Sequence, residues 1–272
     1  MPVITITRGA FSGGPELADR VAATLGYRSV SREVLIEASR RYGIPEAKFT
    51  EVLETAPHWW ERWQESLRLY RIVLQAAMCE VAQGGNVVYH GHAGQELFPG
   101  IGHVLKVYLT APMSYRVEQV RAREKMSENA AMHYIEQVDK GRTRRLQVIF
   151  GADWRDASRY DMVLNVAHMS LEAAAHVIVE AARQRDFQET PESKQAFQDL
   201  TVSARVQAAL VVAPRTRNLT ISVRVEHGRV HVSGILAQSE LEQEIVRIAK
   251  EVSGVNSVEA EFESPPIEYM YP

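Results

Sequence analysis

The spacing of apolar residues divides the first 185 residues into alternating strands and helices. Short runs of apolar and β-branched residues, which are typical of buried strands, cover residues 3–7, 86–89, 104–109 and 162–165. Between them, apolar residues recur every three or four positions, the period of an amphipathic helix. The predicted helices cover residues 17–25, 31–42, 57–83, a segment that begins near 113, and then 127–147 and 170–185. Strands separated by helices pair in parallel, so we predict an α/β fold with a helix-covered parallel sheet.

Two residues mark helix ends in this pattern. Gly26 is placed to end the first helix, and Ser31 is placed to cap the second. In the third helix, Trp59, Trp60 and Trp63 begin a stripe at helical spacing. Such a stripe predicts core packing rather than a ligand box.

The character of the chain changes after residue 185. Residues 186–198 are polar and contain proline, which predicts a linker between a domain at 1–185 and a smaller one at 199–265. The smaller domain is predicted to be α+β, with a short tail at 266–272. Its predicted elements are a helix to 212, strands at 219–225 and 229–233 joined at Gly228, a helix at 239–252 and a strand at 255–262.

Composition narrows the class of protein. The 272 residues carry a net charge of −3 and 46% hydrophobic residues, which is ordinary for a globular chain and argues against a nucleic-acid-binding protein. Cys79 is the only cysteine and lies in an apolar helical pattern, so we expect a buried thiol and no internal disulfide. No leader or membrane-length apolar segment is apparent, so we expect a cytoplasmic protein without stable membrane insertion.

The turn after the first strand has the composition of a phosphate-binding loop. Arg8, Ser12, Gly13 and Gly14 lie between that strand and a helix, where backbone N–H groups and a helix N-terminus attract phosphate. The standard loop adds a lysine and a Ser/Thr, which this chain lacks. Taken alone, the loop fits a simple turn as well as a phosphate site.

Five stretches resemble the cytidylate kinase-like family. The first, ITITRGAFSGGPELADRVAATLGY, fits the family's ISR-x-x-GSGG-R-E loop at Arg8, Ser12, Gly13, Gly14 and Glu16, and departs from it at Phe11 and Pro15. SREVL resembles the family's D-R-E-[IV]-L segment, and VVYHGHAGQELF resembles V-V-I-x-G-R-G-G. VYLTAPMSYRVEQV and DKGRTRRLQVIFGADWRDASRYDMVLN resemble its later strand, lid and last strand. The resemblance covers residues 1–185.

This resemblance implies a P-loop kinase-like sheet with a helical lid, and an ATP-dependent phosphotransferase that uses Mg²⁺ and acts on a nucleoside monophosphate or a related small acceptor. Ser12, Gly13, Gly14 and Glu16 would bind the donor; Gly14 and Glu16 stand where true cytidylate kinases have the lysine and the Ser/Thr. Arg8 would take part of the lysine role, and Arg142 and Arg145, with Arg144 as a further candidate, would close over the phosphates. Arg32 and His92 would face the acceptor.

Each assignment has a plainer alternative. Arg8 also fits a surface or helix-capping arginine, the lid arginines fit a solvated basic helix face, and Arg32 fits a local pair with Glu33 or Glu37. His92 stands where the family has arginine, and imidazole lacks the forked contact of a guanidinium. His90 and His92 could hold a metal ion, but no third ligand follows at characteristic spacing, so we predict no metal site.

The C-terminal segment resembles a BON module over about residues 199–263. Its stretch VRVEHGRVHVSGILAQSELEQEIVRIAKEVSGVNSVEAEF carries the hairpin and the Gly-Val-x-x-Val after the helix. BON modules are usually associated with membranes or small hydrophobic ligands; here the resemblance implies a regulatory or oligomerising role, through a partner or a second copy. Two alternatives to a kinase remain: a nucleotide-binding regulator without transfer activity, and a scaffold that binds no nucleotide.

Overall fold

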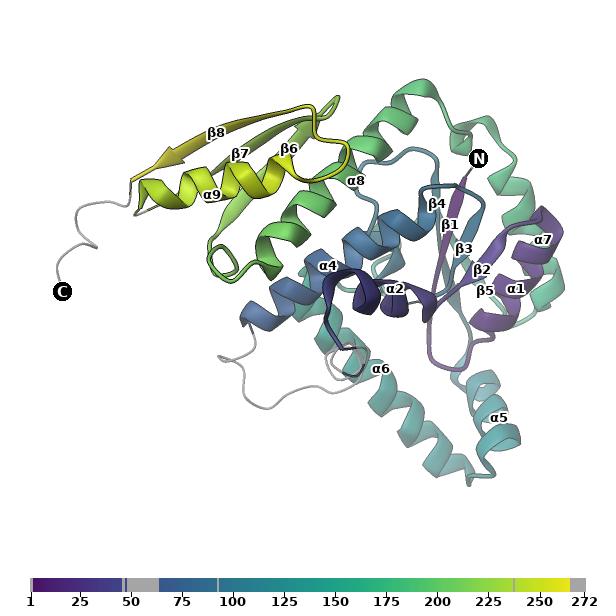
Figure 1. Cartoon of the computed structure of the whole chain (residues 1–272). Helices are drawn as coiled ribbons and strands as arrows, with labels where there is room; N and C mark the ends of the chain where they lie inside the picture. The colour runs from purple at the N-terminus through teal and green to yellow at the C-terminus, as the bar shows by residue number, and fades with distance from the viewer. Residues whose placement is uncertain (1, 46, 48–63, 92, 237, 265–272) are drawn as a thin grey trace.

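The computed structural model describes residues 2–45, 47, 64–91, 93–236 and 238–264. Its larger sheet has five parallel strands in the order β2-β3-β1-β4-β5, which confirms the predicted parallel α/β fold (Figure 1). The strands are β1 Val3–Arg8, β2 Arg28–Val30, β3 Val87–Tyr89, β4 Val104–Thr110 and β5 Met162–Asn165. The short edge strand β2 was not predicted.

Helices cover both faces of this sheet. The helices of this part of the chain are α1 Gly14–Leu25, α2 Glu33–Tyr42, α4 Gln64–Ala82, α5 Met113–Glu124, α6 Glu128–Phe150 and α7 Leu171–Ala182. Because side chains alternate along a strand, Ile4 and Ile6 of β1 pack with α1 and α7, whereas Val3 packs with α2 and α4. Cys79 of α4 is fully buried, as predicted.

Helix boundaries follow local chemistry. Gly26 ends α1 in the left-handed conformation with φ of 70°, as predicted. The prediction that Ser31 caps α2 is wrong: Arg32 is the N-cap residue, and Ser31 donates its backbone N–H to Glu33 instead. Trp59, Trp60 and Trp63 lie outside the described residues.

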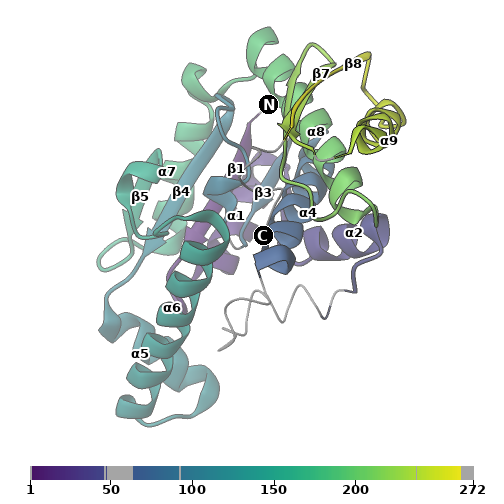
Figure 2. The same ribbon diagram turned by 90° about the vertical axis from the view of Figure 1, so that its left-hand side faces the viewer.

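Helices α5 and α6 form a hairpin that projects away from the sheet in both ribbon views (Figures 1 and 2). Ser127 caps α6 by accepting from the N–H of Ala130. The two helices share a small apolar cluster of Val117, Val120, Ala131 and Ile135. We call this unit the α5–α6 hairpin.

Helix α8, Pro191–Val212, begins eight residues before its predicted start, so residues 191–198 are helical rather than an irregular linker. Thr190 starts the helix with a capping box in which it exchanges hydrogen bonds with Ser193. One set of its residues, Phe197, Ala204, Ala208 and Val211, joins the core around α4. Another set, Val202, Val206 and Leu210, joins the core of the C-terminal module. One helix therefore contributes to two hydrophobic cores.

The C-terminal module contains a separate three-stranded sheet in the order β6-β7-β8, with α9 Ser239–Lys250 packed against β8. Its strands are β6 Ile221–Glu226, β7 Arg229–Ile235 and β8 Ser257–Glu263. β6 and β7 form the predicted antiparallel hairpin, whose turn holds His227 and Gly228 at φ of 50° and 74°. β8 pairs with β7 in parallel.

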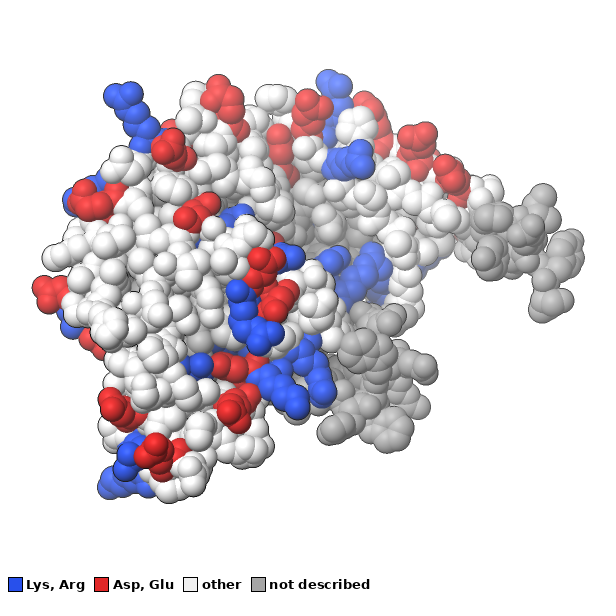
Figure 3. Space-filling model, turned by 180° about the vertical axis from the view of Figure 1, so that it is seen from behind, with Lys and Arg blue, Asp and Glu red and all other residues white. Residues whose placement is uncertain are grey.

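A buried ion pair and a carboxylate cap fasten this module to the rest of the chain. Arg205 of α8 forms an ion pair with Glu80 of α4 and donates to the carbonyl of Ser253 at 3.2 Å. Asp199 of α8 accepts from the backbone N–H groups of His227 and Gly228 at 3.0 and 3.1 Å. On the face seen in Figure 3, acidic and basic side chains are intermixed.

Candidate functional site

The loop between β1 and α1, residues 9–13, lies at the carboxyl edge of the sheet, where open α/β sheets bind ligands. The fully buried Ser12 donates its hydroxyl to the carbonyl of Gly9 at 2.9 Å, which closes the loop on itself. Gly13 is the N-cap residue of α1 with φ of 85°, and a Cβ there would lie 2.8 Å from Leu171. The loop therefore favours glycine at 13 for its conformation, and an added Cβ would also have to displace the Leu171 side chain.

Arg8 occupies the space beside the start of α1. A Cβ at position 14 would lie 1.7 Å from Cδ and 2.7 Å from Nε of Arg8, so only glycine fits while Arg8 keeps this position. The guanidinium Nη1 donates to the carbonyl of His90 at 2.8 Å. The first turn of a helix attracts anions, and Arg8 places a cation next to it.

The environment of Arg8 disfavours its charge. Burial and, to a lesser extent, the nearby charge of Arg142 lower the pKa of Arg8 to about 10, against an opposing effect of Tyr89. The guanidinium still carries a proton at neutral pH. A cation held partly out of water interacts more strongly with an anion than a solvated one does.

Arg142 of α6 reaches the same loop. It donates Nη1 to the carbonyl of Arg8, and its guanidinium lies 5.5 Å from the ring centroid of Trp154. Its Nε is buried without a hydrogen-bond partner, and burial lowers its pKa. Arg145, half-buried, bends back along α6 toward Gly141, and Arg144 is exposed. Of the three lid arginines considered, Arg142 is the one with a described contact to the loop.

Arg116 and Asp139 hold the loop from the hairpin side, and neither was singled out from the sequence. Arg116 of α5 donates to the carbonyl of Ala10 at 2.6 Å and pairs with Asp139 of α6 at 2.5 Å. Asp139 in turn accepts from the N–H of Ala10 at 3.1 Å. The spacing of Asp139 and Arg142, three residues apart on one helix, is the signal that could have suggested a shared face.

Two further predicted site residues, Glu16 and Arg32, are exposed. Glu16 lies on the exposed side of α1 and pairs with Arg20 at 2.9 Å. Arg32 is exposed at the N-cap of α2, where Glu33 and Glu37 are engaged by Ser31 and by Arg40 and Arg41. His92 lies outside the described residues.

Buried polar groups continue the site beside the loop, at the ends of β1 and β3. Thr7 donates to Gln95 at 2.7 Å, and both are buried. Thr5 Oγ1, Gln95 Nε2 and His90 Nδ1 are buried without a hydrogen-bond partner. Burial and the charge of Arg8 lower the pKa of His90, so the imidazole is neutral at physiological pH. Unpartnered buried polar atoms are unusual in a protein interior and here lie next to a candidate ligand site.

The described residues offer no group of three or more His, Cys, Asp or Glu side chains that could hold a metal ion. Asp153 and Asp156, in the loop after α6, pair with Arg155 and Arg159. None of the helices in the described part of the chain combines the length and apolarity that a membrane crossing requires.

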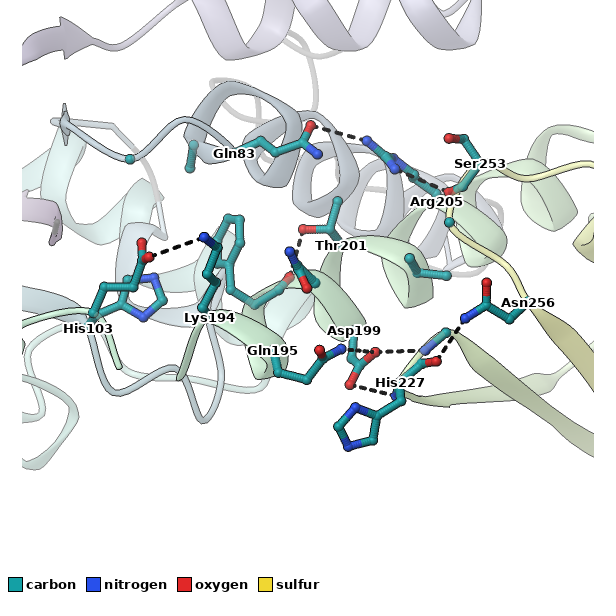
Figure 4. A pocket seen from close by; sticks show the side chains of 18 residues that line it. Gln83, His103, Lys194, Gln195, Asp199, Thr201, Arg205, His227, Ser253 and Asn256 are labelled. Carbon is teal, nitrogen blue, oxygen red and sulfur yellow. Dashed lines mark hydrogen bonds and ion pairs between the residues drawn. The ribbon is translucent and has the colours of Figure 1, made fainter. Parts of the chain in front are cut away.

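A cavity of about 650 Å³ lies apart from the loop, between α4, α8 and the turns of the C-terminal module (Figure 4). Its polar walls are largely engaged with one another: Gln195 donates to Asp199, Asn256 donates to the carbonyl of His227, and Arg205 contacts Gln83. Of these contacts, the one between Arg205 and Gln83 joins α8 to the end of α4.

Comparison with known proteins agrees with this architecture. Residues 3–168 match the family model described as "Cytidylate kinase-like family", and residues 198–265 match the BON domain. Cytidylate kinases of Ignicoccus hospitalis and Pyrococcus horikoshii are 29% and 30% identical, covering 65% and 66% of this chain and 97% and 87% of their own lengths. An uncharacterised protein from Eubacterium ventriosum has a similar solved structure, with a TM-score of 0.53, 17% identity, and coverage of 68% of this chain and 99% of that one. The chain therefore belongs to the cytidylate kinase-like family and carries a C-terminal BON domain.

Proposed function

We propose that this protein is a cytoplasmic, ATP-dependent phosphotransferase that acts on a nucleoside monophosphate, cytidylate-like, or on a related small acceptor. The observation that carries the proposal is the position of Arg8. Its side chain lies across Gly14 at the start of α1, in the space that a lysine side chain at position 14 would need. In this account Arg8 takes over the charge of the missing lysine.

Phosphoryl transfer depends mainly on positioning and on stabilising charge, so a fixed cation at the loop is what the reaction requires. Arg8 would contact the donor phosphates together with the loop at Ser12, Gly13 and Gly14. Arg142, already at the carbonyl of Arg8, would supply a second guanidinium from the hairpin. Because a guanidinium contacts phosphate in a forked manner, Arg8 would also orient the group that lysine only attracts.

Mg²⁺ would enter as the complex with ATP and neutralise charge on the donor phosphates. The described loop residues do not form a ligand set for it. Glu16, at the position of the usual hydroxyl, pairs with Arg20, and the hydroxyl of Ser12 is bonded within the loop. We therefore assign no residue of this chain to the ion.

The acceptor would lie on the β3 side of the loop. The unpartnered groups of Thr5, Gln95 and His90 are the described polar atoms that support this placement. Arg32 and His92 stay candidates for acceptor binding from the resemblance alone. Names of the curated relatives favour a cytidylate-like acceptor.

A second candidate is a nucleotide-binding regulator that has lost transfer activity. The outward position of Glu16 and the absence of a lysine at Gly14 favour it, because both depart from the standard loop. In that case the BON domain would act on a partner or a second copy when nucleotide binds.

Titration calorimetry with ATP and Mg²⁺, then with CMP, followed by a product assay separates these candidates. Binding of ATP with formation of a nucleoside diphosphate supports the kinase. Binding without product supports the regulator. Absence of binding by ATP, CMP and other nucleotides would contradict both.

A further inference from the structure

Phe11 is the residue of the loop that contacts the apolar part of the α5–α6 hairpin. Its backbone has φ of 60°, a left-handed conformation that residues with a side chain seldom adopt. Its half-buried ring packs against the cluster around Val117 and Ile135, and the ring centroid lies 5.6 Å from that of Tyr134. The chain thus keeps phenylalanine where the backbone favours glycine, and the ring is directed to the hairpin.

Polar contacts from the same hairpin hold the residues before Phe11. The carbonyl of Ala10 accepts from Arg116, its N–H donates to Asp139, and Arg142 donates to the carbonyl of Arg8. The two hairpin helices therefore contact the chain at Arg8, Ala10 and Phe11. A shift of the hairpin would have to change the loop.

We propose that Phe11 is a positioning residue that couples the α5–α6 hairpin to the loop, so that donor affinity depends on the ring at position 11. The part that concerns the donor rests on the proposed function. The coupling itself rests only on the packing of Phe11 and on the polar contacts of its neighbours.

Glycine at position 11 isolates the effect of the ring. Because glycine adopts φ of 60° without steric conflict, Phe11→Gly leaves the observed loop conformation accessible while it removes the contact with the hairpin. Phe11→Leu keeps an apolar side chain that can reach the same cluster. Tyr134→Ala removes the ring that faces Phe11 from the hairpin side. Met132→Ala is its matched control, because both residues lie on α6 with similar exposure, 38% and 39%.

Hydrogen exchange of the full chain without nucleotide tests the coupling. In Phe11→Gly, the amides of α5 and α6 should exchange about tenfold faster, while those of α7 stay unchanged, because the hairpin loses its apolar attachment to the loop. Phe11→Leu and Met132→Ala should exchange at close to the wild-type rate. An unchanged rate in α5 and α6 of Phe11→Gly, in protein that remains folded by circular dichroism, would overturn the proposal.

Calorimetry with ATP and Mg²⁺ tests the consequence for the donor. Phe11→Gly and Tyr134→Ala should each weaken ATP binding about tenfold, and the double variant also about tenfold, because both remove one shared contact. The proposal would be overturned if the double variant lost ATP affinity about a hundredfold, or if neither single variant lost ATP affinity. If the wild-type chain binds no ATP, the proposed function fails and the exchange rates alone decide the coupling.

Discussion

The side chain of Arg8 crosses over Gly14 so closely that a Cβ at position 14 would lie 1.7 Å from Arg8 Cδ. The arginine at the end of β1 and the glycine at the start of α1 therefore depend on each other. The glycine provides the space, and the arginine brings the charge.

Adding a methyl group at this contact should disturb the site more than the fold. In Gly14→Ala, Arg8 must move and lose its hydrogen bond to His90, which costs about 1 kcal/mol of unfolding free energy. ATP affinity should fall at least tenfold. Gly84→Ala, at a glycine with no neighbouring atom within 4 Å of the added Cβ, is the control and should leave ATP affinity unchanged. Calorimetry and urea unfolding of both variants check this; equal ATP affinity in Gly14→Ala and wild type would contradict it.

The charge of Arg8 should reduce stability. Burial lowers the pKa of Arg8 to about 10 in the folded state, so the unfolded chain binds the proton more tightly. The resulting loss of folding stability is fully present at pH values well below 10. Arg8→Met should raise the free energy of unfolding by roughly 1–2 kcal/mol at pH 7.5, after the lost hydrogen bond is subtracted.

The same penalty decreases as the folded-state guanidinium loses its proton, so the gain in Arg8→Met should be about 1 kcal/mol smaller at pH 10.5 than at pH 7.5. Urea unfolding of both proteins at the two pH values measures this. If Arg8→Met is less stable than wild type at pH 7.5, the charge contributes to folding and is not held for function.

The fold was largely predictable because β1 and β3 are continuous buried runs and because β4 and β5 are also short runs rich in apolar residues. Strand β2 was missed because it has three residues, two of them polar, and is recognisable only by its pairing with β3. The start of α8 was missed because its first two turns are polar. Composition does not show that Thr190 caps a helix or that Phe197 reaches the core around α4.

The candidate site, like the fold, was predictable only in part. Arg8, Ser12, Gly13 and Gly14 are close in sequence and share one loop, so a local pattern identifies them. Arg116 and Asp139 contact Ala10 across 106 and 129 residues, and only the fold brings them together. Glu16 was placed by alignment with the standard loop, whereas the turn of α1 directs it to Arg20.

Arg142 and Arg144 provide a matched pair on α6. Arg142 contacts the carbonyl of Arg8, whereas Arg144 is exposed. If the hairpin supplies a charge to the transferred group, Arg142→Ala should lower turnover at least a hundredfold and Arg144→Ala less than threefold. Steady-state assays at saturating ATP measure both. Equal losses in the two variants would show that the basic face acts only through its overall charge.

Arg205 is expected to hold the two modules together. It pairs with Glu80, whose side chain is 8% exposed, so Arg205→Ala removes the closer of two ion-pair partners from a nearly buried carboxylate and leaves Arg41 at 3.3 Å. We expect a loss of about 1–3 kcal/mol in the free energy of unfolding. The exposed Arg247 of α9, paired with Glu244 and Glu251, is the control, and Arg247→Ala should destabilise the protein much less. If urea unfolding showed comparable losses of stability in the two variants, Arg205 would not be important for holding the modules together.

The most direct test of Arg8 as the replacement for the missing lysine is transfer of labelled γ-phosphate from ATP to CMP and other nucleoside monophosphates by wild type, Arg8→Lys and Arg8→Ala. We predict that wild type forms a labelled diphosphate, that Arg8→Lys retains part of this turnover because it keeps the charge without the forked contact, and that Arg8→Ala loses at least a hundredfold. Wild-type turnover in Arg8→Ala, with unchanged ATP affinity, would contradict the account.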